Sequence, residues 1–261
     1  MDLQLQGKKA LITGSTAGIG LAIAAALAHE GADVVVNGRT AARVEEAVAK
    51  VRVVAIGAVS GIAVDGGTRA GADRLIAELG DVDILVNNLG IFDPKPFDQI
   101  PDEEWVRFFE VNVMSGVRLS RAFLPGMLRR NWGRVVFISS ESGFQIPAEM
   151  IHYGMTKSAQ IAVARGLAET TAGTAVTVNS VLPGPTRSEG LEEFADKLSG
   201  GKSFEEFERE FFRRVRPSSL LKRFETVEEI ASVVAFVCSP LAAAINGAAV
   251  RAEGGVIKSA F

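Results

Sequence analysis

The sequence predicts an α/β fold, with a parallel sheet covered by helices on both faces. Short runs of apolar and β-branched residues alternate along the chain with longer segments of helical period. Most of these runs are apolar at consecutive positions, which is typical of strands buried on both faces. A glycine-rich turn joins the first run to the first helical segment, an arrangement typical of phosphate-binding folds.

The expected strands are short and are separated by the helical segments. The first, Lys9-Ala10-Leu11-Ile12-Thr13, leads into the glycine turn, whereas Gly57 and Gly61 blur the limits of the third. The expected strands cover residues 9–13, 32–37, 53–64, 82–87, 134–140, 175–182 and 248–252.

The expected helices carry apolar residues at helical spacing, and the first is rich in alanine. They cover residues 19–30, 43–51, 69–79, 102–130, 153–171 and 226–237. Pro125 and Gly126 are expected to bend or end the long helix over 102–130, because proline lacks the backbone N–H that a helix needs.

We expect one domain over residues 1–261, because no proline- or serine-rich linker divides the chain. The composition changes only over residues 188–223, where phenylalanine and charged residues crowd together. Since this segment lies between two elements of the sheet core, it predicts a helical flap near 188–223 rather than a second domain.

The charge and cysteine content argue against several classes of function. A net charge of −3 gives no general attraction to nucleic acid or to an anionic membrane. No apolar stretch approaches the ~20 residues needed to span a bilayer, and the N-terminus lacks the pattern of a signal peptide. The single cysteine, Cys238, can form neither an internal disulfide nor a cysteine zinc site. We therefore expect a cytoplasmic protein without a metal site.

The glycine turn, Thr13-Gly14-Ser15-Thr16-Ala17-Gly18-Ile19-Gly20, predicts a dinucleotide site. Gly14 permits the tight turn, Gly18 lets a pyrophosphate approach the backbone, and Gly20 lets the helix pack on the strand. The free amides and the positive end of that helix then face the phosphates. The spacing differs from the commonest dinucleotide fingerprint, so a strand-to-helix turn that binds nothing remains the alternative.

The residues after the second strand favour NADP over NAD. An acidic residue there would bind the ribose hydroxyls of NAD, but the sequence reads Asn37-Gly38-Arg39. The Arg39 guanidinium can bind a 2′-phosphate in a bidentate way, and Arg43 could add charge. In the alternative, Arg39 is only solvated or stacks on the adenine without selecting a cofactor.

Tyr153, the single tyrosine of the chain, lies four residues before Lys157 on one predicted helix face. A phenol has an ordinary pKa near 10, and we expect the lysine ammonium to lower the pKa of Tyr153 so that it can transfer protons. Ser139 and Ser140 end the preceding strand, where a hydroxyl could hold a carbonyl oxygen beside the phenol. By itself this short pattern is more typical of a surface helix in which the spacing is incidental.

Taken together, these residues resemble the short-chain dehydrogenases/reductases over nearly the whole chain. The matching pieces occur in family order, with Ser140 thirteen residues ahead of Tyr153. They are Thr13-Gly14-x-x-x-Gly18-Ile19-Gly20, Asp65, Asn87-Asn88-Leu89-Gly90, Asn112, Ser140, Tyr153-x-x-x-Lys157 and Pro183-Gly184.

The resemblance implies a doubly wound, Rossmann-like sheet of about seven strands and a homodimer or homotetramer. It implies that Tyr153 is the general acid/base and that Ser140 orients the substrate oxygen. By the same resemblance, Lys157 lowers the phenol pKa and holds the nicotinamide ribose, and Asn112 positions a water that links Lys157 to solvent.

The resemblance also implies how the cofactor is bound. Asp65 would meet the adenine, Asn88 and Gly90 the adenosine side of the cleft, and Tyr153 and Lys157 the nicotinamide side. The other cofactor residues lie in two loops and are Gly14, Ser15, Thr16, Gly18, Ile19, Gly20, Pro183, Gly184 and Thr186. Without the rest of the set, Asn112 and Asp65 would be only a polar helix residue and a polar loop residue.

Candidate substrate residues follow the cofactor elements: Ile91, Phe92, Ser140 and Gln145. Further candidates are the phenylalanines of the flap, although spacing of this kind is more often core packing. They are Phe194, Phe204, Phe207, Phe211 and Phe212.

The sequence thus favours an NADP-dependent oxidoreductase that interconverts a small ketone or aldehyde and its alcohol. The rivals are a 3-oxoacyl thioester reductase, for which Arg129 and Arg130 could dock an acidic carrier protein, and an NAD-linked alcohol or sugar dehydrogenase. From another class, a dinucleotide-sensing protein could keep the fold without the chemistry. Such a protein has no need for the four residues Asn112, Ser140, Tyr153 and Lys157 together.

Overall fold

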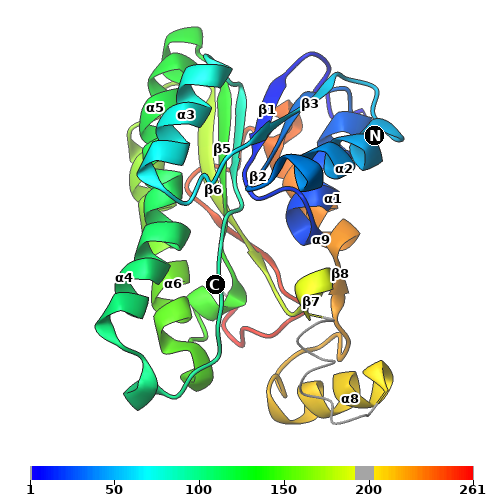
Figure 1. Cartoon of the computed structure of the whole chain (residues 1–261), viewed down its shortest axis with the longest axis vertical. Coiled ribbons are helices and arrows are strands. Elements are labelled where there is room, and N and C mark those ends of the chain that lie inside the picture. Colours follow the sequence, from blue (N-terminus) through cyan, green and yellow to red (C-terminus); the bar gives the residue numbers. More distant parts are fainter. Residues whose placement is uncertain (1, 192–202, 261) are drawn as a thin grey trace.

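The computed structural model describes residues 2–191 and 203–260. Its centre is a parallel sheet of seven strands in the order β3-β2-β1-β4-β5-β6-β9 (Figure 1). The order reverses direction at β1, which confirms the doubly wound fold that the sequence predicts. These strands are β1 (Lys9–Ile12), β2 (Asp33–Gly38), β3 (Val59–Ala63), β4 (Ile84–Asn87), β5 (Gly133–Ile138), β6 (Val176–Pro183) and β9 (Ala249–Ala252).

Helices cover both faces of the sheet, and the two groups lie on opposite sides of it in Figure 1. One face carries α1 (Gly18–His29), α2 (Ala41–Arg52) and α9 (Val227–Cys238). The other carries α3 (Arg69–Leu79), α5 (Ser115–Arg130) and α6 (Ile151–Glu169). The short helix α4 (Asp102–Phe109) extends the second group beyond the sheet.

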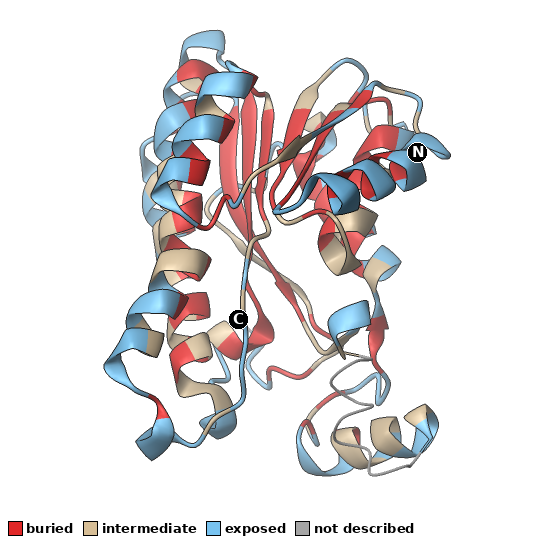
Figure 2. Cartoon of the chain, in the orientation of Figure 1, coloured by how far each residue is buried: buried red, intermediate tan, exposed pale blue. Residues whose placement is uncertain are grey.

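The apolar core consists of two layers, one on each face of the sheet. Strand residues alternate between them, so that Ile12 faces α1 while Leu11 faces α3 and α5. Figure 2 shows the inner strands of the sheet buried along most of their length, whereas the edge strands β3 and β9 are mostly intermediate or exposed. The continuous apolar runs in the sequence are explained by this double coverage.

The long predicted helix over 102–130 is interrupted at a different place than expected. Helix α5 continues through Pro125 and ends at Arg130. Pro125 is exposed, so water can reach the carbonyl of the preceding turn that lacks a partner there. The interruption is a π-turn at Glu110–Met114, between α4 and α5. The expected strand over 53–64 also begins later, at Val59, because α2 extends to Arg52 and a turn follows it.

The flap segment carries a short parallel pair, β7 (Thr186–Arg187) with β8 (Glu225–Thr226), and the helix α8 (Phe204–Arg214). A capping box between Ser203 and Glu206 begins α8. Its phenylalanines pack together with Phe224, but only Phe212 is buried, and Phe207 and Phe211 also line a cavity. The predicted candidate Phe194 lies outside the described residues.

In the part of the chain that the structure describes, no helix combines the length and the apolar character needed to cross a bilayer.

Gly20 illustrates how closely α1 packs on the turn after β1. A Cβ at this position would lie 2.6 Å from the Gly14 carbonyl oxygen and would overlap the Asn88 amide. We expect Gly20→Ala to lower the free energy of unfolding by about 2 kcal/mol, because the backbone must shift to accommodate the methyl group.

Thermal unfolding followed by circular dichroism measures this effect, and Gly166→Ala is the matched control. Gly166 is an exposed residue of α6, and no atom lies within 4 Å of the position that a methyl group would take there. We expect this change to raise stability by up to about 1 kcal/mol through helix propensity. Equal effects of the two substitutions would contradict the packing argument.

Candidate active site

The glycine turn follows β1 and opens α1, at the edge where the carboxyl ends of the strands meet. Gly14 (φ 60°) and Gly18 (φ 54°) both adopt left-handed backbone conformations, which favour glycine. Ala17 is the N-cap of α1, makes no side-chain cap and has no acidic residue in the turn that follows. The first amides of α1 are therefore available to an anionic ligand.

Two residues of the turn bind within the protein. Ser15 is fully buried; its hydroxyl donates to the Ile12 carbonyl (2.7 Å) and accepts from the Asn37 amide (3.0 Å). Thr16 lies against Gly38, and the Thr16 methyl group occupies the space that a Cβ at position 38 would take. Ser15 thus joins β1 to β2. Ile19, further along the turn, lines the cavity described below.

Asn88 fixes the shape of the glycine turn. Its side-chain amide donates to the carbonyls of Thr13 and Gly14, both at 3.0 Å. The Thr13 hydroxyl in turn accepts from the backbone amides of Asn88 (3.0 Å) and Leu89 (3.2 Å). These bonds join the ends of β1 and β4 and place Asn88 in the cavity wall.

Arg39 and Asp65, two of the residues predicted to contact the adenosine end, are exposed. Arg39 directly follows β2, and Asp65 lies in the loop after β3, where it accepts from the Gly67 amide at 3.0 Å. Arg43 faces Glu189 at 3.9 Å, with both side chains more than half exposed, so this pair contributes little to stability.

Ser140, Tyr153 and Lys157 come together where β5 ends and α6 begins. The Ser140 hydroxyl accepts from the Ser142 amide (3.1 Å) and lies beside the Tyr153 phenol, whose ionised form it favours. Lys157 is 4% exposed, and its Nζ donates to the Ile138 carbonyl at 2.9 Å. The Ser139 hydroxyl donates to the main-chain oxygen of Lys157 (2.8 Å). The residues at the end of β5 therefore hold both the main chain and the ammonium group of this lysine.

Asn112 lies in the π-turn and is fully buried. Its side chain accepts from the Ile91 amide (2.8 Å) and donates to the Ile91 carbonyl (3.0 Å) and the Thr156 hydroxyl (3.0 Å). Its main-chain oxygen accepts from the Gln160 side chain at 2.6 Å. Asn112 therefore joins the loop after β4 to α6, whereas its role in holding a water stays a prediction.

The pKa shifts follow from burial. Burial lowers the pKa of Lys157 to about 7 and raises the pKa of Tyr153 above its ordinary value. The hydrogen bond from Ser140 and the positive charge of Arg216 oppose the rise at Tyr153 only in part. The expected lowering of the phenol pKa by Lys157 is thus not present in the protein alone. The Lys157 Nζ lies 5.4 Å from the centre of the Tyr153 ring and donates to the Ile138 carbonyl.

A cavity of about 440 Å³ connects these groups. Its wall includes Ser140, Tyr153, Lys157 and the loop after β6, and the predicted cofactor residues Pro183, Gly184 and Thr186 belong to that loop. From the predicted substrate residues it includes Phe92, Phe207 and Phe211, and Phe92 lies edge-on to Tyr153 with ring centres 6.4 Å apart. Ile91 and Gln145 are not in the wall; Gln145 is exposed, and Ile91 is held through its backbone by Asn112.

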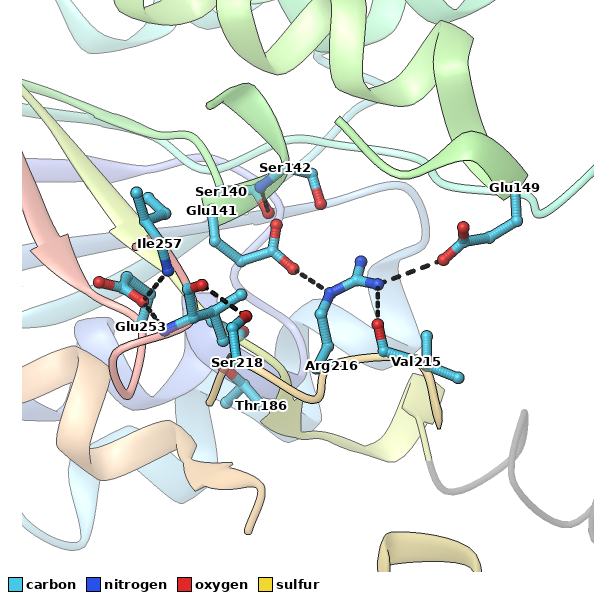
Figure 3. A network of polar contacts seen from close by, with 12 residues as sticks. Ser140, Glu141, Ser142, Glu149, Thr186, Val215, Arg216, Ser218, Glu253 and Ile257 are labelled. Atoms are coloured by element: carbon cyan, nitrogen blue, oxygen red, sulfur yellow. Dashed lines mark hydrogen bonds and ion pairs between the residues drawn. The ribbon is translucent and has the colours of Figure 1, made fainter. Parts of the chain in front are cut away.

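The sequence analysis missed an ion pair in this wall (Figure 3). Arg216 donates through Nε to Glu141 (2.7 Å) and through Nη1 to Glu149 (3.3 Å). Glu141 and Arg216 are both buried although they lie 75 residues apart in sequence. Only the position of Glu141 next to Ser140 could have indicated it.

The remaining residues with metal-ligand chemistry are dispersed. Within residues 2–191 and 203–260, no group of histidine, cysteine, aspartate and glutamate has an arrangement that could hold a metal ion. His152 packs on Phe108 with ring centres 4.0 Å apart, and burial lowers its pKa. Burial raises the pKa of the Cys238 thiol to about 12.

Comparisons with known proteins agree with this geometry. Residues 8–199 match the family model described as short chain dehydrogenase. The chain is 49% identical to an uncharacterized oxidoreductase of Bacillus subtilis, YvaG, over 100% of both chains. It is 33% identical to a 3-oxoacyl-[acyl-carrier-protein] reductase of Aquifex aeolicus, covering 98% of this chain and 100% of the other. Among solved structures, the chain is similar to L-sorbose reductase from Gluconobacter frateurii complexed with NADPH and L-sorbose. The TM-score is 0.93 at 32% identity, and the match covers 99% of this chain and 100% of the other.

Because Tyr153 is the single tyrosine, its ionisation can be followed directly by ultraviolet absorbance. We expect its midpoint in the protein without cofactor to lie above the ordinary value near 10, since burial destabilises the phenolate. Tyr153→Phe supplies the blank, and circular dichroism at each pH shows that the fold persists. A midpoint at or below 10 in the folded protein would show that Lys157 controls the phenol after all.

Proposed function

The chain belongs to the short-chain dehydrogenase family and is an oxidoreductase, and we propose that it reduces a ketone or aldehyde with NADPH, using Tyr153 as the general acid. The reverse reaction oxidises the corresponding secondary or primary alcohol. One observation carries this proposal. The hydroxyls of Ser140 and Tyr153 line the same cavity as Ile19 of the glycine turn, Asn88, which holds that turn, and the residues at the end of β6.

The residues of the turn fit a dinucleotide. The left-handed glycines, Gly14 and Gly18, leave the backbone bare, and the N-terminal amides of α1 lack a side-chain cap. At the other end, the loop with Pro183, Gly184 and Thr186 borders the cavity beside Tyr153. When bound, NADPH supplies the hydride that reduces the carbonyl carbon.

Tyr153 supplies the proton in this proposal. The raised pKa keeps the phenol protonated at neutral pH, so it can donate to the carbonyl oxygen as that oxygen gains negative charge. The Ser140 hydroxyl donates a second hydrogen bond to the same oxygen and orients it. The resulting phenolate recovers a proton from solvent, so each turnover consumes one carbonyl, one hydride and one proton.

Lys157 stabilises the site electrostatically in this proposal. A buried amine with a pKa of about 7 is partly protonated at neutral pH, and its charge favours the phenolate that forms as the proton leaves. Gly90 leaves room beside it, since a Cβ there would lie 3.5 Å from the Lys157 Nζ. This is the space in which a ribose hydroxyl could bind the ammonium.

The preference for NADP over NAD rests on Arg39. Its side chain is exposed after β2, at the adenosine end of the glycine turn, and no acidic residue follows β2 there. Solved structures related to this chain contain NADPH or NADP, which supports the same choice.

The related 3-oxoacyl-[acyl-carrier-protein] reductases make a thioester reductase the second candidate. The basic end of α5 gives this candidate little support. Arg130 is already paired with Asp81 (2.9 Å) and Asp83 (3.6 Å) and donates to the Val82 carbonyl (2.7 Å). Because Asp81 and Asp83 already neutralise the charge of Arg130, Arg129 and Arg130 together do not form a strongly basic docking site.

Tyr153→Phe tests the mechanism. We expect carbonyl reduction with NADPH to fall about 10²–10⁴-fold, because the general acid is lost while the ring and its contact with Phe92 remain. NADPH affinity, measured by fluorescence titration, should stay within about threefold and serves as the control. Turnover at the parent rate would rule out Tyr153 as the acid.

Arg39→Gln tests the cofactor preference. We expect the parent to bind NADPH at least about tenfold more tightly than NADH, a difference of about 1.4 kcal/mol, and the variant to lose this difference through weaker NADPH binding. Both titrations are made at equal salt, and Arg43→Gln is the matched control with a smaller expected effect because Glu189 already faces Arg43. Equal affinity of the parent for both cofactors would contradict the assignment.

A further inference from the structure

Glu225 is a buried carboxylate next to the end of β6. It is 3% exposed and belongs to β8, which pairs with β7 (Figure 1). Its Oε2 accepts from the Gly184 amide at 3.0 Å, and its own main-chain amide donates to the Pro185 carbonyl at 2.9 Å. Glu225 does not line the cavity, but it holds residues 183–186, which line the cavity together with Tyr153.

The sheet already satisfies the Gly184 amide. This amide also donates to the Ala252 carbonyl at 3.0 Å, across the pair of strands β6 and β9. The carboxylate is therefore a second acceptor for one donor, and the backbone hydrogen bonds are complete without an acidic residue at position 225. The charge of Glu225 is the feature that a neutral residue at this position would not supply.

The surroundings make this charge costly. Burial raises the pKa of Glu225 to about 7, and the nearby carboxylates of Glu229 and Glu253 also raise it. The hydrogen bond to the main chain and the charge of Arg223 lower this pKa only in part. Arg223 pairs with Glu229 at 2.7 Å. Arg251 pairs with Glu253 at 2.8 Å, so each of these cations already has another partner.

A carboxylate that is kept at such a cost indicates a functional position. An ionised carboxylate binds an amide more strongly than a neutral acid does, so the charge of Glu225 tightens its contact with Gly184. That contact acts on residues 183–186, the part of the wall proposed to face the nicotinamide.

We propose that Glu225 is a positioning residue for the nicotinamide end of the cofactor: its carboxylate binds the Gly184 amide and fixes residues 183–186 against the ring. Glu225 acts through this main-chain contact and touches neither the cofactor nor the substrate. This inference rests on the proposed function, in which these residues border the nicotinamide.

Glu225→Gln tests this role by binding alone, because it keeps the size and an acceptor oxygen but removes the charge. Two ligands are compared by isothermal titration calorimetry near pH 8: NADPH and 2′-phospho-ADP-ribose, which is NADP without the nicotinamide ring. We expect the Kd of NADPH to rise at least about fivefold, since a charge-assisted hydrogen bond becomes a neutral one. The Kd of the ring-free ligand should stay within about twofold of the parent value. Equal losses for both ligands would show a general effect on the fold and overturn the inference.

Glu228→Gln is the matched control. Glu228 is an exposed residue three positions further along the chain, and the change removes the same charge. We expect both Kd values to stay within about twofold of the parent, because an exposed charge is screened by solvent and salt. A loss of NADPH affinity as large as that of Glu225→Gln would show that net charge controls binding, and would overturn the role of the contact with Gly184.

The pH dependence separates the charge of Glu225 from its shape. With a pKa of about 7, Glu225 is mostly protonated near pH 6 and mostly ionised near pH 8. The ratio of the NADPH Kd of Glu225→Gln to that of the parent should lie within about twofold of one near pH 6 and reach at least about fivefold near pH 8. Lys157 and the 2′-phosphate titrate alike in both proteins, so their effects cancel in this ratio. A raised ratio that does not change with pH overturns the role of the charge.

Stability distinguishes a positioning residue from a merely structural one. The fold raises the pKa of Glu225 from 4.5 to about 7, so the parent loses stability as the pH rises through this range and stays less stable above it. Glu225→Gln removes this loss. We expect its midpoint of thermal unfolding, relative to the parent, to be higher near pH 8 than near pH 5 by at least about 3 °C. A variant less stable than the parent near pH 8 would show a structural role and overturn the inference.

Neither binding nor unfolding requires turnover, so this inference and the proposed reaction can fail separately. If the parent reduces no carbonyl compound but Glu225→Gln loses affinity for NADPH alone, the proposed function is refuted and the role of Glu225 is supported. If the parent reduces carbonyl compounds but the variant binds both ligands as the parent does, the role of Glu225 is refuted and the proposed function is supported.

Discussion

The parallel direction of the strands is the constraint on which the site depends. Since every strand of the central sheet runs the same way, the loops after β1, β4, β5 and β6 all leave from one edge. Direct hydrogen bonds then join these loops: Asn88 holds the glycine turn, and Ser139 and Ile138 hold Lys157. The positions of these groups therefore follow from the register of the sheet.

Burial sets the chemistry of the site in two opposite ways. It lowers the pKa of Lys157 to about 7, because an ammonium loses solvation, and it raises the pKa of Tyr153, because a phenolate does. A phenol that stays protonated is suited to the role proposed for Tyr153, the transfer of a proton to a carbonyl oxygen. The reverse reaction needs the phenolate, and a positively charged oxidised nicotinamide would favour it.

The sequence was sufficient for those parts of the fold and site that depend on local pattern. The apolar runs predicted the strands; the turn around Gly14 opens α1, and Tyr153 and Lys157 share the helix α6, as their spacing predicted. Features that depend on distant partners could not be predicted. The π-turn at Asn112 is stabilised by Ile91, Thr156 and Gln160, and the shift at Tyr153 depends on burial that no spacing reveals.

The ion pair between Glu141 and Arg216 joins the described end of the flap to the sheet. Arg216 lies two residues beyond α8, whose phenylalanines already pack on Phe224, so the pair positions a preformed unit over the cavity. A buried ion pair gives little net stability, but removing one partner leaves an uncompensated charge and is strongly destabilising. Loss of Glu141 or of Arg216 would therefore disfavour the docked position of α8. The contact between Arg216 and Glu141 thus joins the end of β5 to the segment whose Phe207 and Phe211 line the cavity.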